Sequence, residues 1–215
     1  MDQDHDHLEK RRLDRMLFFT DAVFAIVMTL LVLELRPPGG ADPAARAAAI
    51  QALAGPLFAF VLSFSIIGIF WVAHLATTQR LLRFDWLTTI VNLVFLLPIC
   101  LVPFVSAWVG GALMGSDGWV AYDLVMIACS AGNATLVFVQ TRGGGRLMAG
   151  GVTPRERLYR LGRATSPGLS FTVGLVGALA GYVRYSQFAW VLIPVFLTVC
   201  RLFLKPRAAP LAPPA

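Results

Sequence analysis

The chain has 215 residues, of which 57% are hydrophobic and only 14% charged, and its mean hydropathy is +0.71. Soluble domains carry about a quarter charged residues, so this composition excludes an ordinary soluble domain and indicates a multi-pass membrane protein. The net charge of +6 comes from basic residues that lie between apolar runs, a pattern that argues against nucleic-acid binding.

Six apolar segments follow one another, each close to the ~20 residues that a helix needs to cross a bilayer. We place them at residues 16–35, 52–76, 86–109, 119–140, 165–183 and 187–204. Because isolated strands leave backbone groups unsatisfied in lipid, all six are predicted to be helices. Residues 1–15 are too polar for a cleavable signal peptide, and the Pro/Ala-rich tail at 206–215 is predicted to be disordered. The chain, 1–215, is therefore predicted to form a single all-α transmembrane domain.

The basic residues are distributed unevenly between the two sides of the predicted bundle. Fifteen of the 18 Lys and Arg residues lie before the first segment, between the second and third, between the fourth and fifth, or at the end of the sixth. Only Arg36, Arg46 and Arg184 fall on the opposite side. The positive-inside rule then places both termini in the cytoplasm.

Several polar side chains lie inside the first three apolar segments. An ionisable residue there costs ~2.5–3.5 kcal/mol on insertion scales, so Asp21 is a candidate functional residue. Asp21, His74 and Asn92 each lie six or seven residues from the charged residue that borders their segment, which places all three at a similar depth. The side chains of this layer are Thr20, Asp21, Trp71, His74 and Asn92. Two interpretations remain open: a hydrogen-bonded network that joins three helices, or a proton relay or ion-binding site.

The first segment also has an aliphatic stripe. With Asp21 set at 0° and about 100° per residue, Ile26 falls near ~140°, Thr29 near ~80°, Leu30 near ~180° and Leu33 near ~120°. These four residues form one face, and Asp21 points away from it. Such stripes also make ordinary lipid or core contacts, so the pattern alone does not identify a pore.

Motifs of other classes are missing from the sequence. There is no HExxH, GxSxG or P-loop, and no TVGYG filter of ordinary potassium channels. Cys100, Cys129 and Cys200 all lie in apolar segments without a CxxC motif, so we interpret them as buried thiols rather than a disulfide framework or a metal site. The sequence therefore predicts no enzyme, no organic cofactor and no resident metal.

The stretch RMLFFTD at 15–21 resembles the RxxxFSD signature of the transmembrane protein 175 family, the lysosomal potassium channels and their bacterial relatives. Its arginine, phenylalanine and aspartate match, and Thr20 replaces the usual serine while keeping the hydroxyl. WVAH at 71–74 resembles the family's Trp-x-x-His on the second helix, and VNLVFLLPICLVPF at 91–104 resembles its Asn-Leu and later Pro-Phe on the third. The resemblance covers essentially the whole chain, because six helices fit one bacterial repeat.

The resemblance implies a homotetramer in the bacterial inner membrane, in which the first helix of each subunit lines a central pore. It implies a potassium-permeable channel in which Ile26, Leu30 and Leu33 form a hydrophobic constriction and Thr29 an adjacent polar layer. Glu34 is then expected at the outer mouth. The permeating ions that the resemblance implies are K⁺ and, as alternatives, other monovalent cations or protons; it implies no cofactor.

The signature residues are then expected to support the pore helix from behind. This supporting group consists of Arg15, Phe19, Thr20, Asp21, Trp71, His74 and Asn92. The helical angle of Arg15, near ~120°, puts it on the pore side. It is expected either to line the cytoplasmic mouth or to follow a point where the helix unwinds.

Other functions remain as alternatives to a passive channel. A proton-coupled secondary transporter would use Asp21 and His74 as a relay, and a proton-permeable leak pathway is compatible with an aliphatic constriction. Against the transporter, no inverted repeat or matched pair of interrupted helices is visible. A membrane-embedded enzyme or lipid-handling protein is disfavoured by the missing nucleophile and metal motifs.

Overall fold

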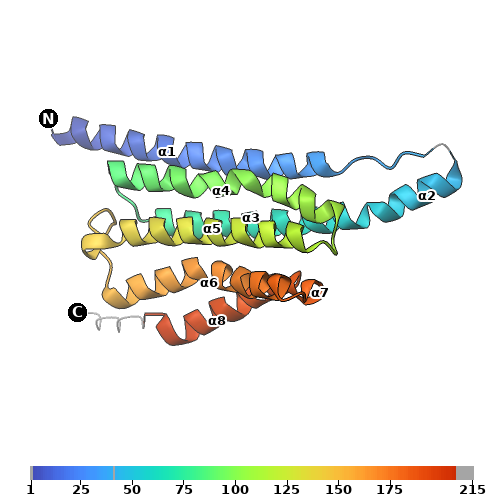
Figure 1. Ribbon diagram of the computed structural model, residues 1–215. Coiled ribbons are helices and arrows are strands. Elements are labelled where there is room, and N and C mark those ends of the chain that lie inside the picture. The colour runs from blue at the N-terminus through green and yellow to red at the C-terminus, as the bar shows by residue number, and fades with distance from the viewer. Residues whose placement is uncertain (1, 41, 207–215) are drawn as a thin grey trace, which may run out of the picture.

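The computed structural model describes residues 2–40 and 42–206, and every regular element in these ranges is helical. The six longest helices are α1 (Asp2–Leu30), α3 (Ala54–Thr78), α4 (Trp86–Gly111), α5 (Ser116–Gln140), α6 (Pro154–Leu179) and α8 (Leu192–Leu204) (Figure 1). Shorter helical pieces are η1 (Leu31–Glu34), α2 (Pro43–Ala52), η2 (Arg142–Gly144), α7 (Val183–Ser186) and η3 (Ala189–Val191).

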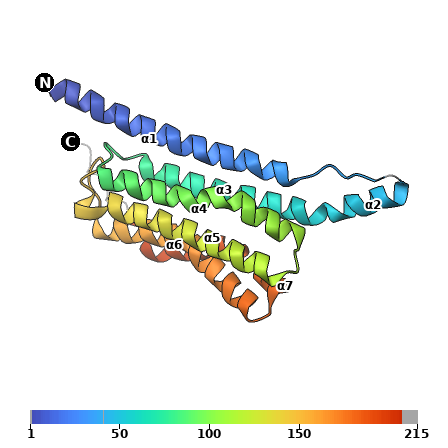
Figure 2. The ribbon, with the colours of Figure 1, turned by 45° about the horizontal axis from the view of Figure 1, so that its top comes forward.

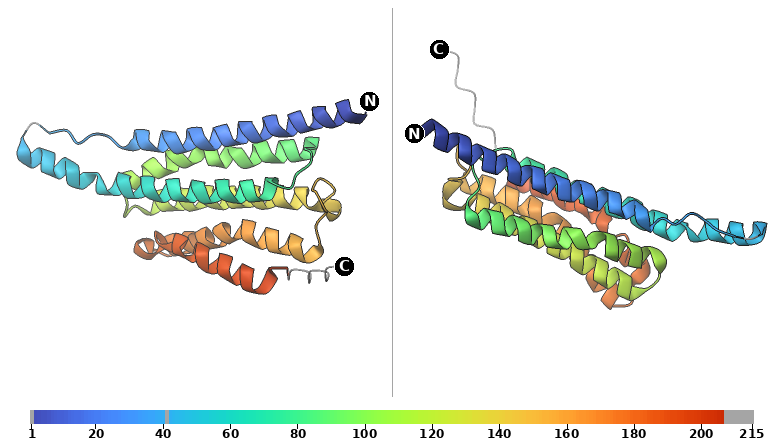
Figure 3. Two further views of the ribbon diagram at one scale, coloured as in Figure 1. Left: turned by 180° about the vertical axis from the view of Figure 1, so that it is seen from behind. Right: turned by 90° about the horizontal axis from the view of Figure 1, so that it is seen from above.

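The long helices lie side by side as an elongated bundle (Figures 1 and 2). Helix α1 runs along one edge and packs on α3 and α4, α4 also packs on α5, and α6 lies between α5 and α8. Helix α8 ends at the same end of the bundle at which α1 begins, while α2 extends past the opposite end (Figures 1 and 3). Because α1 has neighbours on one side only, its other face is open.

Aromatic side chains fill the centre of the bundle. Phe95 of α4 is fully buried, with its ring centroid 6.0 Å from that of Phe24 in α1 and 5.9 Å from that of His74 in α3. Trp119 and Tyr122 of α5 form an edge-to-face pair, with ring centroids 5.7 Å apart. Such pairs add to the stabilisation from burial, so the core joins α1, α3, α4 and α5.

Within the part of the chain that the structure describes, five stretches are long and apolar enough to cross a membrane: Leu8–Glu34, Pro43–Thr78, Trp86–Gly111, Ser116–Gln140 and Val183–Leu204. The prediction of six segments included 165–183, which lies largely in α6. Helix α6 is long enough, but Arg163 and its Ser, Thr and Gly residues lower its hydropathy. Protein covers it on two sides, against α5 and α8, so it needs less apolar surface than a helix surrounded by lipid.

The predicted start of the first helix at residue 16 was wrong, because α1 begins at Asp2. Hydropathy marks the membrane-crossing part of a helix and not its polar extension. The extension is anchored by Leu13, which is buried in a small cluster with Leu81, Leu147 and Met148. At the other end, the α-helix stops at Leu30 and a 3₁₀ turn carries the chain to Glu34.

Two later boundaries also differ from the prediction. Helix α6 begins at Pro154 rather than 165, because Thr153 caps it by accepting a hydrogen bond from the Glu156 amide and proline suits the first helical position. Helix α8 begins at Leu192 rather than 187, which places Pro194 in its first turn, where a missing N–H costs nothing. The part of the predicted disordered tail from 207 to 215 lies outside the described residues.

Helix α2 was not predicted as a separate element. Asp42 accepts a hydrogen bond from the Ala45 amide at 2.8 Å, Pro43 occupies the first turn, and alanine is the best helix former. None of its residues is buried. Local capping and propensity therefore account for α2 without help from the core.

The cysteines are free thiols, and two of the three are buried. Cys129 of α5 and Cys200 of α8 lie in the interior as predicted, but the interpretation of Cys100 as a buried thiol was wrong, because it is exposed on α4. An apolar segment places a thiol within the membrane-crossing part of a helix. It does not specify whether that thiol faces the bundle or the surface.

Candidate functional site

The aliphatic stripe lies on the face that the subunit leaves open; Ile26, Thr29 and Leu30 belong to α1, and Leu33 belongs to the 3₁₀ turn η1 that follows it. Ile26, Leu30 and Leu33 are 56%, 41% and 70% exposed, whereas Phe24 and Val27 are almost fully buried against α3 and α4. At 100° per residue Phe24 lies nearly opposite the centre of the stripe, and Val27 lies about 110° from it. Helix α1 therefore has one face that packs within the subunit and one apolar face that does not.

The two polar groups of this face differ in their surroundings. Thr29 is exposed, and its hydroxyl donates a hydrogen bond to the Ile26 carbonyl oxygen at 2.8 Å. One lone pair of that hydroxyl oxygen can still accept a bond or coordinate a cation. Glu34 is exposed at the end of η1, past the last residue of the stripe.

Behind the stripe, three buried side chains from three helices form a hydrogen-bonded chain. The Asn92 amide of α4 donates to the Thr20 hydroxyl of α1 at 2.8 Å, and Thr20 in turn donates to the Met16 carbonyl oxygen. The Asn92 carbonyl oxygen lies 3.2 Å from Nε2 of His74 in α3. All three of these side chains are at most 2% exposed, so the bonds form where water does not compete.

A second pair lies next to this chain and is separate from it. The indole N–H of Trp71 donates to Asp21 Oδ1 at 2.9 Å. Asp21 is exposed and Trp71 is half-buried, and within the described residues no hydrogen bond joins this pair to the Thr20 chain. The single predicted network is thus two neighbouring groups, because adjacent residues on α1 point about 100° apart.

Among the described residues, no hydrogen bond or ion pair joins either group to Arg15 or Phe19. Both are exposed on α1, and no hydrogen bond or ion pair of the Arg15 side chain occurs among the described residues. The alternative that the helix unwinds before Arg15 was wrong, because α1 is continuous from Asp2.

A buried polar cluster on α3, α4 and α5 was not predicted. Ser63 donates to the Ser106 hydroxyl at 2.9 Å and lies 3.1 Å from the Tyr122 hydroxyl. Asp123 is only 1% exposed, and its Oδ2 has no hydrogen-bond partner among the described residues. Asp123 is an ionisable residue inside an apolar segment, so the rule that singled out Asp21 applies to it equally.

Charged residues connect the helices at the end of the bundle where α1 begins. Asp85 caps α4 through the Thr88 amide at 2.8 Å and forms an ion pair with Arg142. Burial alone would raise the pKa of Asp85, but the bonds from Thr88 and the Arg142 guanidinium lower it below its usual value. Arg80 contacts Glu156 of α6 at 2.7 Å and the Ala149 carbonyl oxygen at 2.7 Å. We call this the basic end of the bundle.

The comparisons with known proteins agree on one family. Residues 15–103 match the family described as the endosomal/lysosomal potassium channel TMEM175. A potassium channel of Streptomyces collinus is 32% identical over 185 residues, which is 79% of this chain and 90% of that protein. A potassium channel of a Chryseobacterium species is 27% identical over 136 residues, covering 57% of this chain and 69% of that protein.

Solved structures show the same fold. The crystal structure of a lysosomal potassium-selective channel TMEM175 homolog from Chamaesiphon minutus superposes with a TM-score of 0.75 at 21% identity, covering 88% of this chain and 98% of that one. A point variant of the potassium channel MtTMEM175, crystallised with a nanobody fusion protein, gives 0.61 at 16% identity, covering 87% and 92%. At these identities the likeness concerns the fold alone.

Proposed function

The chain belongs to the TMEM175 family of potassium channels, and we propose on this basis that it is a potassium-permeable channel of the bacterial inner membrane, assembled as a homotetramer. The family consists of channels and not enzymes. The positive-inside rule supports an orientation in which the basic end of the bundle faces the cytoplasm.

The open face of α1 is the observation that carries the pore assignment. Four copies of α1 around an axis would aim Ile26, Leu30 and Leu33 at each other and leave Phe24 and Val27 packed on their own subunit. The constriction would then consist of aliphatic rings, which gate by excluding water. The Thr29 hydroxyls lie within the same face and would form the polar layer between these rings.

This geometry gives a physical basis for a preference among cations. Without a ring of backbone carbonyls, an ion must shed part of its hydration shell to pass the aliphatic rings. Potassium loses water at lower cost than sodium, because it is larger and binds its hydration shell less strongly. The Thr29 hydroxyl oxygens could replace part of the lost water, and Glu34 would attract cations to the outer mouth.

The polar groups behind the stripe have a supporting role in this proposal. Helix α1 has neighbours on one side only, so its rotation depends on few contacts. The bonds Asn92–Thr20 and Trp71–Asp21 attach it to α4 and α3 at adjacent positions. Two attachments about 100° apart around α1 oppose its rotation and would keep the stripe directed at the axis.

Ion flux into liposomes tests the proposal. Purified wild type should pass K⁺ faster than Na⁺ down equal gradients, and Ile26→Asn and Leu30→Asn should bring the ratio of the two fluxes toward one. Leu97→Asn, on an exposed position of α4 outside the stripe, is the matched control and should keep the wild-type ratio. Folded protein that passes no ion under any gradient, or passes K⁺ only with a fixed number of protons, would contradict a passive channel.

A further inference from the structure

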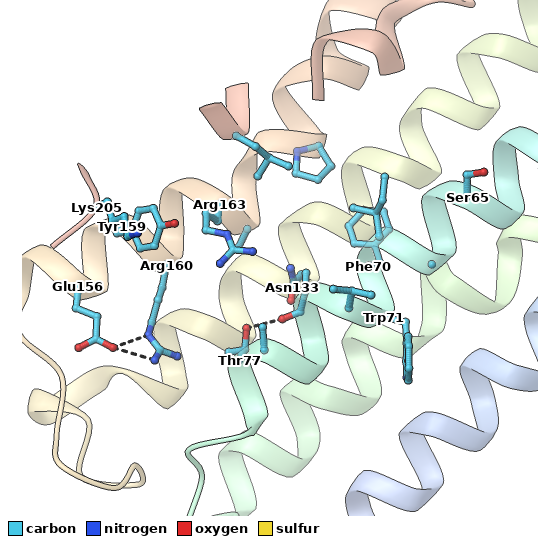
Figure 4. A pocket seen from close by; sticks show the side chains of 18 of the residues that line it. Ser65, Phe70, Trp71, Thr77, Asn133, Glu156, Tyr159, Arg160, Arg163 and Lys205 are labelled. Atoms are coloured by element: carbon cyan, nitrogen blue, oxygen red, sulfur yellow. Dashed lines mark hydrogen bonds and ion pairs between the residues drawn. The ribbon is translucent and has the colours of Figure 1, made fainter. Parts of the chain in front are cut away.

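A groove of about 860 Å³ is lined mainly by α3, α6 and the end of α8, with Met28 of α1 and Asn133 of α5, and no residue of the aliphatic stripe lines it. Figure 4 shows its two ends: Glu156, Arg160, Arg163 and Lys205 gather at one end, and Phe70 and Trp71 lie toward the other. The charged end belongs to the basic end of the bundle. Along the rest of its length the walls are mainly apolar. The groove therefore matches a phospholipid, with a charged end for the headgroup and apolar walls for the acyl chains.

The charges at this end do not cancel. Glu156 accepts bonds from both Arg80 and Arg160, at 2.7 and 2.8 Å. Within residues 2–40 and 42–206, neither Arg163 nor Lys205 forms an ion pair. Three cationic side chains therefore line the groove against one carboxylate, and that carboxylate is already shared between two guanidinium groups.

A buried polar side chain also faces this end. Asn133 of α5 lines the groove, is only 2% exposed, and its Oδ1 has no hydrogen-bond partner among the described residues. The neighbouring Ser130 hydroxyl donates to the Ala164 carbonyl oxygen at 2.8 Å. Because α5 and α6 run antiparallel, Asn133 is level with the turn that carries Arg160 and Arg163, as Figure 4 also shows.

An unpartnered amide oxygen in a buried site costs free energy, and it calls for a ligand that donates a hydrogen bond. A phosphate diester next to Arg163 and Lys205 would balance the charge, and a hydroxyl on the same headgroup would satisfy Asn133. The apolar walls beyond would take the acyl chains.

We propose that this groove binds an anionic phospholipid with a hydroxyl-bearing headgroup, drawn from the leaflet at the basic end of the bundle. Phosphatidylglycerol has this chemistry and is the probe of choice. A neighbouring subunit is the other conceivable occupant, but it would have to place carboxylates opposite Arg163 and Lys205. The proposal requires the chain to lie in a membrane and does not depend on which ion it conducts.

Native mass spectrometry of the purified full chain, with lipids titrated in, measures binding directly. We expect wild type to bind dioleoyl phosphatidylglycerol more tightly than phosphatidylcholine. Each basic side chain near a lipid surface contributes roughly fivefold, so Arg163→Gln combined with Lys205→Gln should weaken phosphatidylglycerol binding by roughly 25-fold. Arg155→Gln, on the same helix outside the groove, and the charge-preserving Arg163→Lys should both bind like wild type.

Asn133→Leu tests the hydroxyl. It should reduce the preference for phosphatidylglycerol over phosphatidic acid, which has no headgroup hydroxyl of the glycerol kind, and leave phosphatidic acid binding unchanged. Equal binding of phosphatidylglycerol by wild type and the double variant would overturn the proposal, as would displacement of the lipid by millimolar inorganic phosphate. Absence of lipid binding together with dissociation of the oligomer by Leu197→Arg would identify a neighbouring subunit as the occupant. None of these readouts requires ion flux, so they are independent of the channel assignment.

Discussion

The Asn92 side chain donates a hydrogen bond to the Thr20 hydroxyl at 2.8 Å and thereby joins α4 to α1 across a fully buried contact. The carbonyl oxygen of the same Asn92 side chain lies 3.2 Å from Nε2 of His74 in α3. Asn92 is thus shared between α1 and α3, and the removal of either partner leaves part of its amide unsatisfied.

Thr20→Val tests this contact, because valine keeps the shape of threonine and removes the hydroxyl. Hydrogen bonds between membrane helices contribute ~0.6 kcal/mol on average and up to ~1.7 kcal/mol, so we expect destabilisation in that range. Thr20→Ser keeps the hydroxyl and should stay close to wild type. The midpoint of thermal unfolding in detergent measures both variants, and equal midpoints for valine and serine would show that the bond contributes nothing.

The Trp71–Asp21 pair leads to a prediction about assembly. Asp21→Ala should lower the yield of the assembled oligomer more than it changes the ratio of K⁺ to Na⁺ flux. The reason is that Asp21 accepts the hydrogen bond from Trp71 that attaches α1 to α3, and that it points away from the stripe. Trp71→Phe keeps an aromatic ring and removes only the donor, so it should show a milder form of the same defect. Size-exclusion chromatography measures the yield. Normal assembly of Asp21→Ala with altered selectivity would instead make Asp21 a conduction residue.

Regular geometry explains which parts of this site the sequence could predict. The common depth of Thr20, His74 and Asn92 follows from the constant rise of a helix, counted from charged residues at the membrane boundary. The shared face of Ile26, Thr29 and Leu30 on α1 likewise follows from 100° per residue. Neither result needs knowledge of which helices touch.

Contacts between distant segments could not be predicted in this way. The Ser63–Ser106–Tyr122 cluster and the Asp85–Arg142 pair depend on the order in which the helices pack, which no local pattern in the chain specifies. The Asp21–Trp71 pair is separate from the Thr20 chain because of where α3 and α4 lie around the axis of α1, which the sequence of α1 does not specify. The polar turns of α1 before residue 16 were missed because a hydropathy plot does not detect helix outside the membrane.

The pKa of Asp85 leads to a prediction about pH. Its folded-state pKa is lowered, so the stabilisation from its ionised form is complete above the ordinary value of 3.8 and is lost as the pH falls through the lower folded-state value. Asp85→Asn keeps the cap on α4, since asparagine caps as well as aspartate, and removes the ion pair with Arg142. The difference in unfolding midpoint between wild type and Asp85→Asn should be constant from about pH 5 upward and should shrink below pH 3.8. A difference that persists at the lowest pH would exclude the ionised carboxylate as its source.

Small residues allow α3 and α4 to approach closely, and adjacent glycines at the end of α4 provide a matched test. A methyl group at Gly110 would lie 2.9 Å from the Pro56 Cα atom, whereas at Gly111 nothing lies within 4 Å. Glycine and other small residues permit close packing of membrane helices, so the contact of Gly110 with α3 depends on the missing side chain.

Gly110→Ala should therefore force α3 and α4 apart at this end and cost ~1–3 kcal/mol, the usual range for overpacking. Gly111→Ala should be neutral or stabilising by up to ~1 kcal/mol, because alanine favours the helix. Ser63 and Ser106 bond to each other along the same interface, so the separation should also weaken their contact with Tyr122. If the unfolding midpoint fell equally in both variants, the loss of stability would come from a changed helix end and not from the packing of α4 on α3, and the prediction would be wrong.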